Sequence, residues 1–417
     1  MIDEVRAEPA ARPQPLGVFP LPAGFFLVPG GEDTEACRAD LVAGRVPQSW
    51  PPALRAHELA LAGDIDGARA ELRGDDPVTR YNRFVVDPDG EDPARLREDL
   101  GEPFAVLVDL VSFVLGRADS PPELGTADGE LAALVLSAQA TQAVDRGEPE
   151  RALRLLEEAV TPALGVSRPL AGVLLGAAAA IRKDARVPGT SGPAQEVVDT
   201  LGRALELLDG TDLRVAQAEM HLTLALTLHE EAGERRDLLV RAVKHYQAAL
   251  RLVTSGEAPE LWAAAHANLA TAYLTMPMTE ASDQLRRGVA VRSLRSALKV
   301  YTPETHPERW ASAQLNLANA LVYVPSRHQG DNLVEAVELY EAVLEVRDRE
   351  HDPLGRARVL ANQGNALAHL GMFDHAKAKL YEARFIFEEF QDGESVRTVR
   401  TVLDEIARQT TLTRTQG

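Results

Sequence analysis

The sequence ANLATAY at residues 267–273 recurs twice with small changes, as LNLANAL at 315–321 and as ANQGNAL at 361–367. The first and second copies are offset by 48 residues (268 to 316) and the second and third by 46 (316 to 362). A weaker copy, HLTLAL, precedes them at 221–226. A motif that returns at a regular spacing of this size indicates a repeat architecture, in which each unit stacks on its neighbours.

A second pattern follows each copy of the first. Its members place apolar residues at i, i+3 and i+4, which puts them on one face of an α-helix. Aromatic residues make up only 5% of the 417 residues, so strong helix formers outnumber the residues that favour strands. The sequence therefore predicts an all-α protein whose repeat unit is a helical hairpin. The second pattern reads YQAAL at 246–250, LRSAL at 294–298, YEAVL at 340–344 and YEARF at 381–385.

The last repeat carries the most specific motif. Small residues at Gly364 and Ala376 are followed by Leu380, and the turn GMFDHA at 371–376 separates the two expected helices. This pattern resembles the signature of tetratricopeptide repeats (TPRs), in which small residues let two helices approach and large ones fill the space beside them. The resemblance implies an α-solenoid of stacked helical hairpins, a right-handed TPR-like superhelix. Turns of the same kind stand at 147–152 (GEPERA) and 63–68 (GDIDGA).

Two of the repeats are longer than a typical tetratricopeptide repeat. Trp262 and Trp310 each precede the asparagine of their copy by six residues, and the extra length falls between the two helices, at 275–287 and 324–332. Because the tryptophans hold the same repeat position, we expect them to anchor the packing between hairpins. This long-period form resembles the arrays that accompany caspase-like CHAT domains in bacteria, which implies a bacterial protein.

The patterns divide the chain into four segments. They are an irregular segment rich in proline and glycine at 1–49, a first hairpin with an atypical helical insertion at 50–128, the TPR-like array at 129–391, and a capping helix with a frayed tail at 392–417. The insertion contains one apolar helix, expected at 103–115, whose packing partner the sequence does not identify. Hairpins are expected near 50–74, 129–161, 168–208, 212–253, 259–302, 307–347 and 353–391.

An isolated apolar stretch, FFLV, stands at 25–28 in the irregular segment. The prolines and glycines around it exclude a long helix, yet the stretch is too apolar for a free linker. Two interpretations are open. It docks against the first hairpin as part of the core, or it lies in the groove of the array as a lid that a partner must displace.

The resemblance also implies a binding groove, because the first helix of each tetratricopeptide hairpin lines the concave side of the array. Asparagine both donates and accepts hydrogen bonds, so a ladder of asparagines on that side can pair with the backbone of an extended peptide. Alternatively, the amides cross-link adjacent helices inside the stack. The predicted partner-binding residues are Gln217, His221, Asn268, Thr271, Ser312, Asn316, Asn319, Tyr323, Arg358, Asn362, Asn365 and His369.

Composition limits the partners and the compartment. The chain has 44 basic against 63 acidic residues, a formal net charge of −19, so phosphate backbones and anionic membrane surfaces are repelled on average. We therefore predict a protein or peptide partner, no nucleic acid and no membrane. The single cysteine, Cys37, excludes an intramolecular disulfide, and the N-terminus lacks the pattern of a secretory signal. These features predict a cytoplasmic protein.

The sequence contains no pattern typical of catalysis. His57-Glu58 has no second histidine four residues on, which excludes a common zinc motif. No Gly-x-Ser-x-Gly elbow is present, and the acidic neighbours of Cys37 raise a thiol pKa instead of activating it. We therefore predict no catalytic residue, no metal and no cofactor, and a protein that is not an enzyme.

Three functional hypotheses follow. The first is a protein- or peptide-binding scaffold or adaptor in a bacterial cytoplasmic assembly. The second is a peptide-sensing regulatory protein. The third is an unrecognised enzyme or an accessory subunit of a biosynthetic enzyme, with residues 1–128 as the place for its chemistry. The open surfaces of such an array also allow a homo-oligomer.

Overall fold

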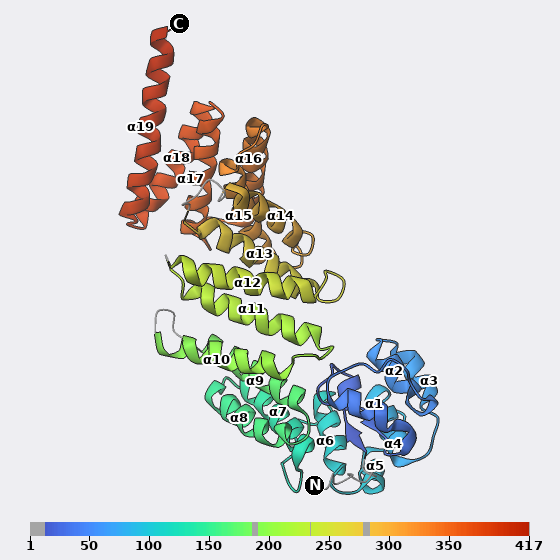
Figure 1. Cartoon of the computed structure of the whole chain (residues 1–417). Helices are drawn as coiled ribbons and strands as arrows, with labels where there is room; N and C mark the ends of the chain where they lie inside the picture. Colours follow the sequence, from blue (N-terminus) through green and yellow to red (C-terminus); the bar gives the residue numbers. More distant parts are fainter. Residues whose placement is uncertain (1–12, 186–190, 234, 278–283, 417) are drawn as a thin grey trace, which may run out of the picture. The chain divides into compact units, whose positions relative to one another are not determined.

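The computed structural model of the chain describes residues 13–185, 191–233, 235–277 and 284–416 (Figure 1). Within residues 55–230 and within residues 236–416 each described helix packs against the next in chain order, which confirms the predicted all-α class and the α-solenoid of stacked hairpins. The chain divides into two compact units, Met1–Glu231 and Ala232–Gly417. Residues 1–12 of the irregular segment, part of the loop expected at 275–287, and Gly417 lie outside the described residues.

The second unit is a stack in which each described helix packs against the next. The hairpins expected at 259–302, 307–347 and 353–391 are the pairs α13 and α14, α15 and α16, and α17 and α18. Helix α12 precedes these pairs and α19 follows them (Figure 1). The bounds are α12 Arg236–Leu252, α13 Pro259–Thr275, α14 Gln284–Ala297, α15 Pro307–Tyr323, α16 Gln329–Val346, α17 Pro353–His369, α18 Phe373–Glu389 and α19 Gly393–Gln416.

Proline starts the first helix of each of these hairpins. Pro259, Pro307 and Pro353 each hold a first helical position, where the missing N–H is not needed and the fixed φ favours the helix. Within the last hairpin, a Cβ added at Gly364 would lie 2.7 Å from a side-chain carbon of Leu380. The small residue therefore sets the distance between α17 and α18, as the tetratricopeptide pattern predicts.

The first unit contains a shorter stack of the same kind. The apolar stretch at 170–181 contains two glycines because α9 approaches its neighbours closely at both. A Cβ at Gly172 would lie 2.1 Å from Leu208, and one at Gly176 would lie 2.4 Å from Met220. The bounds are α7 Gly129–Asp145, α8 Pro149–Leu164, α9 Arg168–Asp184, α10 Ser191–Leu207 and α11 Arg214–Glu230.

Short helices and a small sheet precede this stack. The apolar helix expected at 103–115 is α6, and it packs between α5 and α7, which supplies the partner that the sequence left open. Helices α4 and α5 were not predicted. The bounds are β1 Gln14–Pro15, η1 Ala23–Phe25, β2 Leu27–Val28, α1 Glu32–Val42, η2 Pro52–Leu54, α2 Arg55–Leu61, α3 Ile65–Glu71, α4 Pro77–Val86, α5 Pro93–Leu100 and α6 Ala105–Val114.

The apolar stretch at 25–28 docks in the core of the first unit. Leu27 is fully buried, and Asn82 of α4 pairs with both of its backbone groups: Leu27 N–H donates to Oδ1 at 2.7 Å, and Nδ2 donates to the carbonyl at 2.9 Å. His57 of α2 also contacts that carbonyl through Nε2 at 3.0 Å, and burial lowers the pKa of His57 to about 4. The docking interpretation is therefore confirmed, and the lid interpretation is not retained.

The last helix is longer than the sequence predicts. Helix α19 runs to Gln416, so the tail expected to fray from residue 410 continues the capping helix instead. Val396, Val399, Leu403 and Ile406 are buried against the stack, and polar residues lie between them. In the part of the chain that the structure describes, no helix is both long and apolar enough to span a bilayer.

A buried carboxyl group ties the small sheet to the first helix of the stack. Glu130, in the first turn of α7, is only 5% exposed and accepts hydrogen bonds from Gln14 Nε2 and from the backbone of Gly17. Burial raises its pKa to about 8, although both hydrogen bonds act in the opposite direction. The folded protein therefore keeps a proton on Glu130 at pH values where the unfolded chain has lost it.

This difference in protonation predicts a pH dependence of stability. Because the folded pKa lies above the ordinary value of 4.5, the contribution of Glu130 to stability falls as pH rises from about 4.5 to about 8, with a slope of about 1.4 kcal/mol per pH unit for one proton. His57, whose folded pKa is lowered to about 4, contributes a slope of opposite sign below about 6.5, so the Glu130 slope is measured as the difference between the wild type and a variant. The variant Glu130→Gln keeps an acceptor for Gln14 and removes this slope. Urea unfolding across the window measures it, and an equal slope in the variant contradicts the assignment.

Candidate functional site

The predicted partner-binding residues of the second unit lie on the first helices of three successive hairpins. Helices α13, α15 and α17 contact one another directly, so their exposed sides form one continuous surface. Five asparagines on it are half-buried, and we call them the amide ladder. They are Asn268 on α13, Asn316 and Asn319 on α15, and Asn362 and Asn365 on α17.

The first two rungs of the amide ladder use their N–H groups within the protein. Asn268 Nδ2 donates to the carbonyl of Ala264, one turn back on its own helix, at 2.9 Å. Asn316 Nδ2 donates across helices to Thr271 Oγ1 at 3.5 Å. The Thr271 hydroxyl itself donates to the carbonyl of Ala267 at 3.1 Å, so it can only accept from Asn316. Both Nδ2 groups are therefore engaged within the protein.

Asn319 is the most connected rung. Its Oδ1 accepts from the hydroxyl of Tyr340 on α16 at 2.7 Å and from Nδ2 of Asn362 on α17 at 3.0 Å. Tyr340 is buried, which raises the pKa of its hydroxyl. Asn319 therefore joins three helices, and the predicted cross-linking role applies to this rung. The asparagine pattern did not point to Tyr340, although tyrosine opens three of the four second patterns, YQAAL, YEAVL and YEARF.

Tyr323 and Asn365 form the next contact along the ladder. Asn365 Nδ2 lies 3.2 Å from the hydroxyl of Tyr323, whose side chain is 54% exposed. Arg287 of α14 donates to the carbonyl of Tyr323 at 2.7 Å, and its guanidinium lies 5.8 Å from the centre of the tyrosine ring. An exposed aromatic ring with a fixed position thus stands beside the amides.

Four oxygens of the amide ladder remain available at the surface. No described residue donates to Oδ1 of Asn268, Asn316, Asn362 or Asn365, and none of these oxygens is buried. The ladder is therefore both a cross-link and an exposed set of acceptors, and the two interpretations drawn from the sequence do not exclude each other. Amide oxygens carry no formal charge and suit neutral N–H donors.

The remaining predicted residues surround this surface. Ser312, Arg358 and His369 are exposed. The pKa of Asp392 is lowered mainly by hydrogen bonds from Ser395 and to a smaller extent by Arg358. At the α17 end, Asn365 and His369 line a cavity of about 300 Å³. The other wall of the cavity is α19, with Thr401, Val402, Glu405, Ile406, Arg408 and Gln409.

The two residues predicted on α11 belong to the first unit. Gln217 Nε2 donates to the carbonyl of Leu208 at 2.9 Å and to Thr211 Oγ1 at 3.0 Å, so its amide stabilises the turn before its own helix. His221 is half-buried on the same helix. The structure thus brings ten of the twelve predicted residues onto the neighbouring helices α13, α15 and α17.

The two repeat tryptophans pack around one small cluster. Trp262 and Trp310 are half-buried and lie against Ala263, Ala297 and Tyr301. The tryptophans at this position of successive repeats therefore contribute to the packing between hairpins, as expected.

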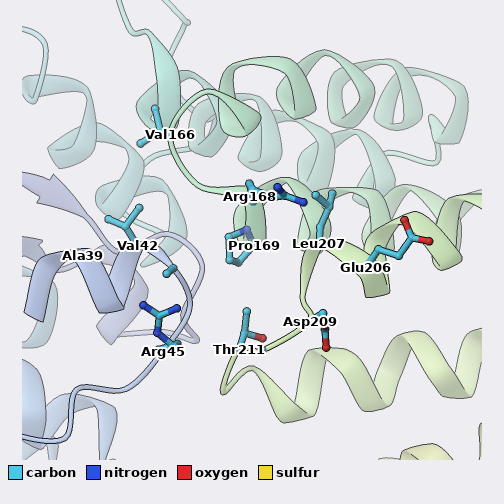
Figure 2. A pocket seen from close by; sticks show the side chains of 12 residues that line it. Ala39, Val42, Arg45, Val166, Arg168, Pro169, Glu206, Leu207, Asp209 and Thr211 are labelled. Atoms are coloured by element: carbon cyan, nitrogen blue, oxygen red, sulfur yellow. The ribbon is translucent and has the colours of Figure 1, made fainter. Parts of the chain in front are cut away.

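The first unit has a cavity of about 490 Å³ between α1, the start of α9 and the α10–α11 turn (Figure 2). Hydrogen bonds fix its rim, since Asp212 N–H donates to the carbonyl of Gly44 at 2.8 Å. Gly44 has a φ of +70° and a Cβ there would lie 3.1 Å from Thr211, so only glycine fits this close approach. The ionisable lining residues are exposed, namely Arg45, Arg168, Glu206 and Asp209. The cavity lies where α1 packs beside the start of α9 and the α10–α11 turn. None of the ionisable residues that line it is buried.

Comparisons with known proteins add one likeness of fold. No protein-family model matches the chain, and no curated protein matches it. Among solved structures, the chain is similar to the human IFIT1 dimer with PPP-AAAA, with 13% sequence identity and a TM-score of 0.39. The match covers 86% of this chain and 73% of the other. At this level the likeness concerns helical-repeat architecture alone.

The same comparison corrects the prediction about nucleic acid. The similar structure was solved with PPP-AAAA, an RNA, so the exclusion of nucleic acid that we drew from the net charge of −19 is wrong. The physical reason is that charges are screened over about 10 Å at 0.1 M salt. A sum over the whole chain therefore does not determine the local field at any one surface.

The hydrogen bonds of the amide ladder predict different costs for two of its rungs. Asn319→Ala leaves the buried hydroxyl of Tyr340 without its acceptor and should destabilise the second unit by about 1–3 kcal/mol. Asn268→Ala removes a bond within one helix and improves helix propensity, so the change should stay within about 0.5 kcal/mol. Urea unfolding followed by tryptophan fluorescence compares the two. Equal losses contradict the assignment of Asn319 as the cross-link.

Proposed function

We propose that this chain is a non-catalytic binding protein whose second unit holds an extended peptide segment of a partner protein across α13, α15 and α17. The observation that carries the proposal is the free carbonyl oxygen on each of Asn268, Asn316 and Asn362. These three asparagines stand on three successive first helices. A row of oriented acceptors fits the regularly spaced N–H groups of a peptide backbone.

Simple geometry supports an extended ligand. Helices in contact lie about 8–10 Å apart, and an extended chain advances about 3.3 Å per residue. A peptide that crosses the helices would therefore present an N–H to a new asparagine at about every third residue. Contact through the backbone leaves specificity to the side chains, for which the exposed ring of Tyr323 and the cavity beside His369 provide places.

The role that fits this site is a scaffold or adaptor. The resemblance of the long-period repeats to arrays beside bacterial CHAT domains supports a place in a bacterial cytoplasmic assembly. A peptide-sensing regulator would use the same surface but would change conformation on binding. An accessory subunit of an enzyme would instead need chemistry in residues 1–128. The cavity of about 700 Å³ there has four ionisable lining residues, none of them buried, namely Arg97, Glu102, Asp109 and Glu123.

A phage library of random linear peptides, selected on the full-length chain, tests the proposal. Selected peptides should lose at least about tenfold in affinity, about 1.4 kcal/mol, for the double variant Asn268→Ala and Asn316→Ala. Isothermal titration calorimetry measures the loss. Asn332→Ala is the matched control, because Asn332 lies on α16, a second helix, and is also half-buried.

Methylation of the peptide's backbone nitrogens provides an independent test. It removes N–H donors without changing the side chains, so it should weaken binding to the wild type and have little effect on the already weak binding to the double variant. Peptides that bind the double variant as tightly as the wild type would contradict the proposal. So would a selection that yields no peptide from the full-length chain.

A further inference from the structure

The second helices form another continuous surface, on the side of the stack away from the amide ladder. Arg295 of α14 bridges to Glu335 of α16 at 2.9 Å, and Lys379 of α18 lies 3.9 Å from Glu341 of α16. These pairs show that the exposed sides of α14, α16 and α18 lie next to each other. The exposed charges on this surface are arranged in rows of opposite sign, as follows.

Equivalent repeat positions carry opposite charges, basic on α14 and the turn after it, and acidic on α16. Aligning LRSAL at 294–298 with YEAVL at 340–344 gives an offset of 46 (294 to 340). All six side chains at the three equivalent pairs of positions are exposed, and we call them the charge-paired surface. The pairs are Arg292 with Glu338, Arg295 with Glu341, and Lys299 with Glu345.

Most of the charge on this surface is not neutralised within the chain. Among the described residues, no ion pair engages Arg292, Lys299, Glu338 or Glu345. The charge of the basic half also acts on a nearby histidine. Burial lowers the pKa of His266 to about 4, and the positive charge of Lys299 contributes to this lowering. The two halves of the surface thus present unpaired charge of opposite sign, side by side.

We propose that the charge-paired surface binds the same surface of a second copy of this chain. A two-fold axis that runs along the seam between α14 and α16 would place α14 of each copy over α16 of the other. The interface would then contain the same basic-to-acidic contact twice, as two-fold symmetry requires. On α16 the outer charges, Glu338 and Glu345, are seven residues apart, which is two helical turns or about 10.5 Å. On the basic side Arg292 lies on α14 and Lys299 lies in the turn just after α14 ends at Ala297, also seven residues further along the chain.

Exposed apolar side chains extend the same surface. Leu285 lies seven residues before Arg292 on α14 and is 75% exposed, and Val334 lies one turn before Glu338 on α16 and is 48% exposed. The symmetric arrangement would cover both side chains. Burial of apolar area contributes about 25 cal/mol per Å², and the charges would select the partner and fix the register.

A second copy explains the charges better than an unrelated acidic partner does. An acidic partner would use α14 and leave the acidic row on α16 facing solvent or in repulsive contact. Only a partner with a basic row and an acidic row at the same spacing satisfies both helices, and this chain carries that pair. The net charge of −19 on each copy opposes association at long range, but screening limits this repulsion to about 10 Å at 0.1 M salt.

Sedimentation velocity of the full-length chain tests the proposal. We expect dimers at about 0.1 M salt that dissociate at about 1 M, where the screening length is about 3 Å. Two charge-reversed variants, Arg292→Glu with Lys299→Glu and Glu338→Lys with Glu345→Lys, should each be monomeric, because like charges would then face each other. An equimolar mixture of the two should dimerise again, since each helix then meets its opposite charge.

Controls separate this surface from general effects of charge. Glu158→Lys with Asp404→Lys changes the net charge as much as the α16 reversal does, at exposed sites on α8 and α19, and should dimerise like the wild type. Circular dichroism shows whether each variant is folded. A wild-type monomer at low salt, dimers that persist in either reversed variant, or a mixture that stays monomeric would each overturn the proposal. Binding of a nucleic-acid duplex by wild-type monomers, lost in the α14 reversal, would assign the basic row to phosphate instead.

Discussion

The structure depends on the inability of a single helical hairpin to cover its own apolar side. In the second unit, Tyr340, Leu380 and Phe387 are buried in one hydrophobic cluster that spans successive hairpins. Because only a neighbour supplies the missing contacts, stability arises between repeats as much as within them. The small residues at the crossings, Gly364 among them, are a consequence of this constraint, since larger side chains would separate the helices that must touch.

The same constraint explains how much of the fold could be predicted. The period of the asparagine motif and the i, i+3, i+4 spacing located the stacked hairpins, because packing of one helix on the next needs that periodicity. The segment before the stack follows no period. Its core is made by pairings that are distant in sequence, such as Asn82 with Leu27 and Glu130 with Gln14. Neither pairing leaves a local signal, and helix α4 carries Asn82 of the first pairing.

The candidate site was predictable in its location and less so in its chemistry. Helical spacing placed the asparagines on one side of the first helices, and the structure brings those helices together. Whether an amide faces solvent or a neighbour depends on residues in other helices, such as Tyr340 beside Asn319. The sequence therefore left the binding and cross-linking roles as alternatives. The structure shows the cross-links, and the binding role of the four free oxygens is our proposal. The corrected prediction about nucleic acid has a similar origin, because a total charge contains no information about position.

The hydrogen bonds within the amide ladder also affect how a partner would be received. Asn316 is held by Thr271, and Asn362 by Asn319, so their rotamers are fixed in the free protein. Ordering a free side chain at an interface costs about 0.5–1.5 kcal/mol. These two asparagines are already held in the free protein, so binding would not need to order them again. The receiving surface is thus preorganised, and the entropy lost on association would come mainly from the ligand.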